Sequence, residues 1–292
     1  MKLSLAAKFN LVFIVVFMVG FVAAGFVADR LLKNNAREET LRTARMLMDS
    51  ALATRSYTTK QVLPLIKPLM TETFLPQSVP SYAATEHLHA LLEKYPAFSY
   101  KEATLNPTNP RDRTADWEAD VVNEMRRQNT TTEIVGERDS STGRSLYMAK
   151  PLQIKDGACL ICHSVPEAAP KPMVAQYGPN NGFGWKLNEI VGAQIISVPM
   201  DVPMKRAAEI WNSFMLSLLG VFAFLFVALN VMVYFFVTRR ITALAHLADE
   251  VSMGKFDAAE FNTGGSDEVS KLAQSFGRMR TSLASAMRML EE

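Results

Sequence analysis

The sequence predicts an α+β domain between two membrane-spanning helices, with a separate helical bundle after the second span. Three observations predict this arrangement. Two long uncharged apolar segments divide the chain of 292 residues, the segment between them mixes helical and strand patterns, and amphipathic helices follow the second segment. The composition agrees, because 49% of the residues are hydrophobic and only 21% are charged.

The first apolar segment, residues 9–28, follows a short N-terminal stretch, residues 1–8, and has no charged residue. At about 1.5 Å rise per residue, a helix of this length crosses the ~30 Å hydrocarbon core of a bilayer. A cleaved signal peptide is the alternative, because Lys2 and Lys8 precede the segment and small residues end it. We favour a membrane helix, since a helical pattern continues directly after the segment.

The second apolar segment, residues 210–238, is bounded by Glu209 and Arg239 and is also uncharged. It is long enough to cross the bilayer with a tilt or to continue as a helix beyond it. Trp211 and Tyr234 are placed as anchors at the two membrane interfaces. The chain is therefore expected to cross the membrane twice, with both termini on the same side.

Residues 29–209 form the domain between the two spans. Its first part, residues 31 to about 66, has apolar residues at three- and four-residue steps, which predicts a long helix disturbed by Pro64 and Pro68. Turn-forming residues at 106–112 and 139–143 separate the later elements, which form a meander of four or five strands with helices before it. These elements are helices over residues 82–94 and 114–128, and strands over residues 98–104, 131–137, 145–154 and 192–199.

The segment Cys159-Leu160-Ile161-Cys162-His163 has the CxxCH spacing that is typical of covalent c-type haem attachment. On one helical turn these positions share a face, so two thiols reach the porphyrin vinyl groups while the imidazole meets the iron. We therefore predict one covalently attached haem c. Cys159 and Cys162 form its thioethers, and His163 is the proximal iron ligand.

Two alternatives use the same cysteines. A CxxC pair can act as a redox-active dithiol or supply half of a zinc site. The sequence lacks the βαβ pattern in which a redox-active dithiol is usually found. It also lacks the second pair of cysteines that a zinc site would need. Because haem c is attached outside the bacterial cytoplasm, haem attachment places residues 29–209 in the periplasm. The protein is then a two-pass protein of the bacterial inner membrane, with both termini in the cytoplasm.

The sixth position of the iron has several candidate ligands, and an open position is the alternative. His87 and His89 lie two residues apart in a predicted helix, so they point in different directions. Met148 and Met173 offer thioethers, and a methionine ligand would raise the reduction potential, although methionine more often fills a core. Around the haem, Arg111 is a candidate partner for a propionate, and Trp117 and Trp185 are candidates for lining the pocket.

Residues 239–292 contain two short amphipathic helical patterns joined by a linker. The first pattern ends at Gly254, and the second begins near Ser266 with Asp267 and Glu268 as N-cap and acidic first turn. Neither helix can bury its apolar stripe alone. This predicts a four-helix bundle formed by two copies of the chain.

Residues 239 to about 290 resemble a HAMP domain. The resemblance rests on Arg-Arg-Ile at 239–241, on Gly254, and on the pattern Asp-Glu-Val-x-x-Leu-x-x-x-Phe-x-x-Met at 267–279. The proline that is usual in the first HAMP helix is absent here.

Residues 42–199 resemble the periplasmic, PAS-like c-type haem sensor domains that precede HAMP modules in bacterial receptors. The matching segments are Arg55-Ser-Tyr57-Thr, Leu105 to Arg113, Trp117-Glu-Ala-Asp120, the CxxCHS motif at 159–164, Tyr177-Gly178 and Gly182-Phe-Gly-Trp185. Members of this family can pair the motif histidine with a cysteine from the N-terminal helix. This chain has no such cysteine, and Tyr57 is the strongest candidate that the corresponding stretch offers.

These features predict a haem c sensor that couples haem redox state or small-gas binding in the periplasm to a cytoplasmic HAMP relay. The chain is expected to form a homodimer through its HAMP and transmembrane helices. It is expected to signal to a cytoplasmic partner protein in trans, because no output region follows residue 292. The alternative is a membrane-tethered monohaem electron-transfer cytochrome c. The sequence shows no nucleophile–base pair that would predict an enzyme. Its net charge of +2 is too small to indicate binding to nucleic acid.

Overall fold

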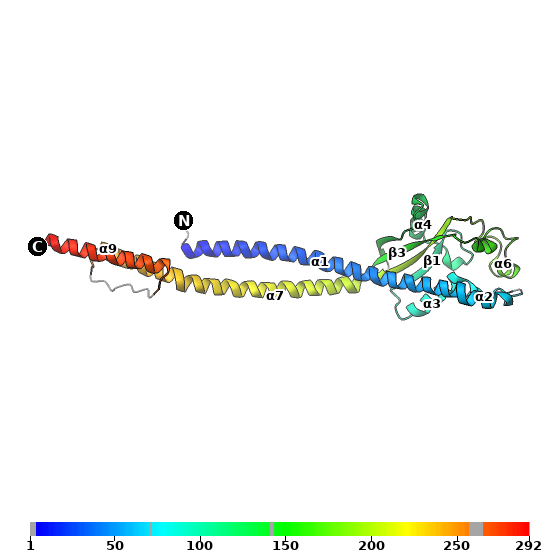
Figure 1. Ribbon diagram of the computed structural model, residues 1–292, viewed down its shortest axis with the longest axis horizontal. Helices are drawn as coiled ribbons and strands as arrows, with labels where there is room; N and C mark the ends of the chain where they lie inside the picture. Colours follow the sequence, from blue (N-terminus) through cyan, green and yellow to red (C-terminus); the bar gives the residue numbers. More distant parts are fainter. Residues whose placement is uncertain (1–3, 71, 141–142, 257–264, 292) are drawn as a thin grey trace. The chain divides into compact units, whose positions relative to one another are not determined.

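The computed structural model describes residues 4–70, 72–140, 143–256 and 265–291. The chain divides into two compact units (Figure 1). One unit is Asp29–Ile210, and the other comprises Met1–Ala28 and Trp211–Glu292.

A four-stranded antiparallel sheet is the centre of the unit Asp29–Ile210 (Figure 1). Its strands are β1 (Ser99–Thr104), β2 (Ile134–Ser140), β3 (Gly143–Gln153) and β4 (Ile190–Pro199). The spatial order β1-β4-β3-β2 corrects the predicted meander. Strands β2, β3 and β4 are consecutive neighbours, but β1 pairs with the last strand, from Ser99 opposite Ser197 to Thr104 opposite Gly192. The chain between β1 and β2 crosses a face of the sheet as helix α4 (Asp116–Gln128), so β1 lies at the free edge of β4.

One continuous helix, α1 (Leu5–Tyr57), contains both the first apolar segment and most of the helix predicted after it. A π-helical turn, Thr58–Val62, then leads into α2 (Leu63–Ile66) and a 3₁₀ turn, Lys67–Leu69. Proline has no N–H to donate, so Pro64 and Pro68 account for this breakdown of the regular helix. The predicted disturbance near residue 66 is thus confirmed.

The remaining helices of this unit are short. Helix α3 (Pro80–Leu92) and helix α4 confirm the helices predicted over residues 82–94 and 114–128. Helices α5 (Leu160–His163) and α6 (Lys171–Tyr177) lie in the connection between β3 and β4. Of the predicted turn at 139–143, residues 141 and 142 lie outside the described residues.

The sheet buries an apolar cluster on each face, because side chains alternate along a strand. On one face, residues of β1, β3 and β4 such as Met148 and Ile196 pack against α1 and α3, where Leu88 is fully buried. On the other face, Ala149, Ala193 and Ile195 pack against the apolar side of α4. The two clusters fix α1 and α4 on opposite faces of the sheet.

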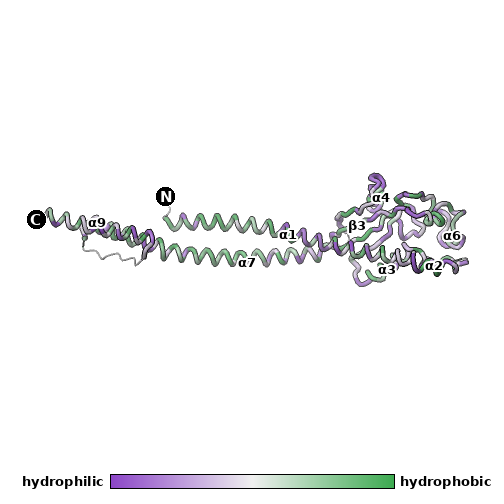
Figure 2. The backbone as a smooth tube through the Cα atoms, viewed as in Figure 1, coloured by the Kyte–Doolittle hydropathy of each residue, from purple (hydrophilic) through white to green (hydrophobic). Residues whose placement is uncertain are grey.

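The other unit contains the apolar helices. Two helices of the described chain are long and apolar enough to cross a membrane, one within Leu5–Leu69 and one within Asp201–Ser252, and Figure 2 shows their hydrophobic stretches in green. Hardly any residue of their apolar windows is buried. Trp211 Nε1 donates a hydrogen bond to Gly25 O at 3.0 Å, and the rings of Phe17 and Phe222 stack with centroids 5.1 Å apart. Exposed apolar surface on this scale fits a membrane protein.

The second apolar segment lies in α7 (Asp201–Val233) and a π-helical turn, Tyr234–Thr238, after which come α8 (Arg239–Ser252) and α9 (Glu268–Glu291). Asp267 caps α9, because its Oδ1 accepts a hydrogen bond from Ser270 N at 2.8 Å. Arg240 of α8 donates to the same carboxylate at 2.8 Å. Gly254, at φ +85°, ends α8 as predicted. The predicted linker at 257–264 lies outside the described residues.

A substitution at Gly192 tests how closely β1 and β4 are paired. A Cβ at this position would overlap Ala103 O and would lie 2.9 Å from Thr104 Cα, and both are backbone atoms of β1. We expect Gly192→Ala to reduce the free energy of unfolding by about 1–3 kcal/mol, because a strand must shift to admit the methyl group. The measurement is unfolding of the full chain in detergent, followed by circular dichroism. Gly157→Ala is the control, since a Cβ there has no atom within 4 Å. Equal losses in the two variants would contradict the close approach.

Candidate functional site

The CxxCH motif forms a helical turn in the connection between β3 and β4. Asp156 Oδ1 accepts a hydrogen bond from Ala158 N at 2.8 Å and caps the turn Gly157–Cys159, which α5 continues to His163. Cys159 and Cys162 are free, half-buried thiols. The local geometry therefore presents two thiols and an imidazole at helical i, i+3 and i+4 positions.

The ring of His163 is held by a hydrogen bond and by a stacked aromatic ring. Its Nδ1 lies 2.7 Å from Gly182 O and 3.4 Å from Thr108 Oγ1. Trp185 stacks against the ring with centroids 3.9 Å apart and an interplanar angle of 12°. A carbonyl oxygen only accepts hydrogen bonds, so Nδ1 carries the proton and Nε2 has a free lone pair. Burial lowers the pKa of His163 and favours its neutral form. Metal-binding histidines have this arrangement, with one ring nitrogen donating to a fixed acceptor.

The acceptor carbonyl is itself fixed by the loop that carries it. Gly182 adopts φ +82°, and a Cβ there would overlap the Thr108 side chain. Asn106 Oδ1 accepts from Gly182 N, and Asn106 Nδ2 donates to Phe183 O, each at 3.3 Å. Trp185 N donates to His163 O at 3.1 Å. Three segments that carried the family resemblance, residues 105–113, 159–164 and 182–185, thus meet at His163.

The surroundings of the thiols disfavour the dithiol and zinc alternatives. Burial raises the pKa of Cys159 and of Cys162, and Asp156 raises the pKa of Cys159 further, whereas Arg55 acts to lower it. Reactive dithiols need a lowered thiol pKa. Within the described residues, no group of three or more His, Cys, Asp or Glu side chains is arranged to hold a metal ion. A structural zinc site needs four such ligands.

A buried polar network lies near Cys159. Arg55 Nη1 of α1 donates to Glu102 of β1 at 2.6 Å, and the side chains of this ion pair are 28% and 4% exposed. Tyr100 Oη donates to Glu102 Oε1 at 2.8 Å and accepts from Gln194 Nε2 at 3.0 Å. The network therefore ties α1 to β1 and β4. Because the charge of Arg55 also influences the pKa of Cys159, this part of α1 lies within electrostatic range of the motif.

The sequence patterns did not predict this network. Arg55 and Glu102 are 47 positions apart, so no local pattern links them. One signal was present in the strand itself. Tyr100 and Glu102 occupy alternate positions of β1, and a carboxylate at a core-facing strand position requires a buried cation or several donors.

The residues predicted as candidates for the sixth iron ligand lie on several different elements of the structure. Met148 is fully buried in the apolar cluster beneath α1 and α3, and Met173 is buried on α6. His87 and His89 are exposed on α3, and His87 Nε2 lies 3.3 Å from Ser50 Oγ. Tyr57, at the end of α1, is exposed.

The two predicted tryptophans and Arg111 lie in different places. Trp185 stacks on His163, whereas Trp117 lies on the α4 face of the sheet beside Tyr147. Arg111 forms an ion pair with Glu86 at 2.5 Å, and its guanidinium lies 4.8 Å from the centre of the Tyr82 ring. Helix α3 therefore already provides this cation with a counterion.

The fold and the site define a haem-protein-like α+β domain joined to a HAMP domain. Residues 33–199 match the Tll0287-like family model, and residues 234–285 match the HAMP domain model. The chain belongs to the Tll0287-like family and carries a C-terminal HAMP domain, which confirms the predicted combination. Among solved structures it is similar to the cyanobacterial haem-protein Tll0287, at 11% identity and a TM-score of 0.44, over 55% of this chain and 95% of that chain. No curated protein matches it.

The raised pKa of Asp112 predicts that the stability of the folded chain depends on pH. Burial raises its pKa to about 6, with Arg111 opposing the shift and Glu102 adding to it, and its side chain is 22% exposed. An unfolded aspartate has a pKa near 4, so the folded state holds the proton to a higher pH. The stability contributed by this proton is complete below about pH 4 and is lost as the pH rises through about 6.

We therefore expect Asp112→Asn, which stays uncharged, to raise the melting temperature at pH 7 by roughly 3–6 °C relative to the unaltered chain. The difference should shrink toward pH 4. The measurement is thermal unfolding in detergent between pH 4 and 7. Asp120→Asn, at an exposed position of α4, is the control. A difference between Asp112→Asn and the unaltered chain that does not change with pH would contradict the buried-carboxyl argument.

Proposed function

We propose that the protein is a membrane haem c sensor, with one haem attached through Cys159 and Cys162 and held by His163. The hydrogen bond from His163 Nδ1 to Gly182 O carries the proposal, because it leaves Nε2 available next to two thiols on the same helical turn. The donor set fits haem c, which requires two thiols and one neutral imidazole. Bound haem supplies a one-electron redox centre and an iron that can take a small gas such as NO, CO or O2.

Arg55 is the residue through which the site acts on α1. It pairs with Glu102 in a largely buried position, so its charge is weakly screened and responds to charge changes near Cys159. Helix α1 runs without a break from Arg55 back to Leu5. A shift of Arg55 is therefore carried along a stiff helix into the first span. Strand β4 gives a second connection, since α7 begins at Asp201, two residues after β4 ends.

The HAMP domain is the element that responds. Along α9, Leu272, Met279 and Leu283 are exposed within one chain, so the helix presents an apolar stripe that a second copy would cover. A homodimer with two helix packings of similar free energy responds to small displacements of its spans. The haem domain lies in the periplasm and both termini in the cytoplasm, where a partner protein in trans receives the signal. The chain itself performs no catalysis in this scheme.

One observation favours a second function, that of a membrane-tethered electron-transfer cytochrome c. Ile161, inside the motif, and Val165, just after it, are both exposed. Exposed apolar side chains beside a redox group suit brief docking of a partner protein. A carrier needs neither ligand exchange at the iron nor any change in the spans, and these properties separate the two functions.

Covalent attachment is tested by removing the thiols. We expect the purified chain to keep its pigment after denaturation and acid–acetone extraction, and Cys159→Ala with Cys162→Ala to lose it, because no thioether can form. Ile161→Ala is the control within the same pentapeptide and should retain the pigment. Complete extraction of pigment from the unaltered chain would refute the haem c proposal.

Signalling is tested by disulfide crosslinking of single cysteines introduced along residues 215–237. We expect the crosslinking pattern between chains to differ among the oxidised, reduced and NO-bound states. Arg55→Gln should suppress the difference while haem stays attached, because it removes the charge that connects α1 to the site. Arg45→Gln, which removes an exposed pair with Glu133 at 3.0 Å, should preserve it. Identical patterns in all three states would exclude signalling and leave the electron carrier.

A further inference from the structure

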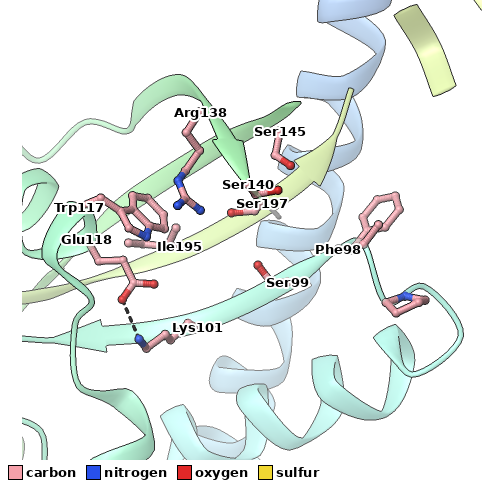
Figure 3. Close-up of a pocket in the computed structure, with 12 residues that line it drawn as sticks. Phe98, Ser99, Lys101, Trp117, Glu118, Arg138, Ser140, Ser145, Ile195 and Ser197 are labelled. Carbon is pink, nitrogen blue, oxygen red and sulfur yellow. Dashed lines mark hydrogen bonds and ion pairs between the residues drawn. The ribbon is translucent and has the colours of Figure 1, made fainter. Parts of the chain in front are cut away.

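A pocket lies on the face of the sheet opposite α1. It has a volume of about 230 Å³ and is lined by residues of β1, β2, β3 and β4 and the start of α4 (Figure 3). Strand alternation separates it from the face that carries the Arg55 network. Tyr100 and Glu102 of β1 face α1 and the Arg55 network, whereas Ser99 and Lys101 line the pocket. The pocket is therefore a feature independent of the CxxCH motif.

Arg138 gives this pocket a positive charge. Its guanidinium extends over β3 and β4 beside the Trp117 ring, with Cζ 4.2 Å from the ring centre (Figure 3). Arg138 forms no ion pair with any residue that the structure describes. Lys101, the other cation of the pocket, is neutralised by Glu118 at 2.7 Å. One uncompensated guanidinium therefore remains in the pocket.

Serine hydroxyl groups line the same pocket as this guanidinium. Ser99, Ser145 and Ser197 line the pocket from three strands (Figure 3). Their side-chain oxygens make no hydrogen bond to any residue in the described part of the chain. Glu118, the carboxylate of the pocket, is held by its Oε2, which accepts from Lys101 Nζ and from Ala115 N, each at 2.7 Å. The pocket thus offers several hydrogen-bond donors and one cation.

We propose that this pocket binds a small organic carboxylate. A guanidinium presents parallel N–H groups that match the two oxygens of a carboxylate, and the serine hydroxyls can donate to the same oxygens. Trp117, Ile195 and Phe98 provide apolar walls for a short carbon skeleton. The volume is below the roughly 300–1,000 Å³ of pockets for drug-sized ligands, so the ligand has only a few carbon atoms.

A ligand in this pocket would contact the strand that leads to the membrane. Ile195 and Ser197 belong to β4, which ends at Pro199, and α7 begins at Asp201. The proposed carboxylate is thus a second input, received on the face of the sheet opposite the Arg55 network. It does not depend on haem attachment, so either proposal can fail without the other.

The experiment is isothermal titration of the full-length protein in detergent, at constant ionic strength, with sodium acetate and sodium succinate as probes. Sodium phosphate serves as the comparison anion. We expect at least one carboxylate to bind and phosphate to bind more weakly, because the apolar walls favour a carbon skeleton. Arg138→Gln should weaken carboxylate binding by about ten- to a hundredfold, the range expected for loss of a charge-assisted pair. Ser197→Ala should weaken it less.

Arg126→Gln is the matched control, since this exposed arginine of α4 pairs with Glu189 at 2.8 Å and does not line the pocket. Circular dichroism and the haem absorption spectrum of each variant verify that the domain is folded. Three results would overturn the proposal. They are the absence of binding by both carboxylates, equal binding by Arg138→Gln, and preferential binding of phosphate, which would define an inorganic oxoanion site instead.

Discussion

The hydrogen bond between His163 Nδ1 and the carbonyl of Gly182 is the interaction on which the candidate site depends. It selects the tautomer of the imidazole, and the Trp185 ring fixes the plane in which Nε2 points. The carbonyl points at His163 only because Gly182 adopts a positive φ and Asn106 holds the loop from the other side. The imidazole of the motif is therefore oriented by residues from two other parts of the chain. The CxxCH pentapeptide provides two thiols and an imidazole, and the fold provides their orientation.

The Arg55–Glu102 ion pair is not explained by a net contribution to stability. Burying two charges costs desolvation energy that their attraction only partly offsets, so such a pair rarely adds net stability compared with apolar residues. Glu102 is nevertheless well supplied with donors, from Arg55 and from Tyr100. The pair is better explained by what it connects, since α1 meets the sheet here through a charge rather than through packing alone. Apolar contacts tolerate small shifts with little change in free energy, whereas a charge within range of the motif responds to any change of charge there.

Sequence patterns predicted the helices and the helical turn at the motif, because each depends on local periodicity or on a local spacing. They did not predict that β1 pairs with β4. That pairing joins Ser99 to Ser197, nearly one hundred residues apart, and depends on where α4 carries the chain. The ion pair of Arg55 with Glu102 likewise depends on where the fold carries the chain. The same is true of the hydrogen bond between His163 and the carbonyl of Gly182. In this protein the chemistry-bearing residue types are visible in the sequence, whereas the contacts that orient them are made by the tertiary fold.

Strand β4 connects both faces of the sheet to the second span. Gln194 belongs to the Arg55 network on the α1 face, whereas Ile195 and Ser197 line the Arg138 pocket on the other. The end of this strand is tightly packed, because Met200 N donates to Arg144 O at 2.9 Å and a Cβ at Gly143 would overlap the carboxylate of Asp201, the first residue of α7. Interiors packed this closely shift as units rather than deform. A displacement of β4 on either face would therefore move the start of α7, and this strand is the shared route from both faces to the second apolar helix.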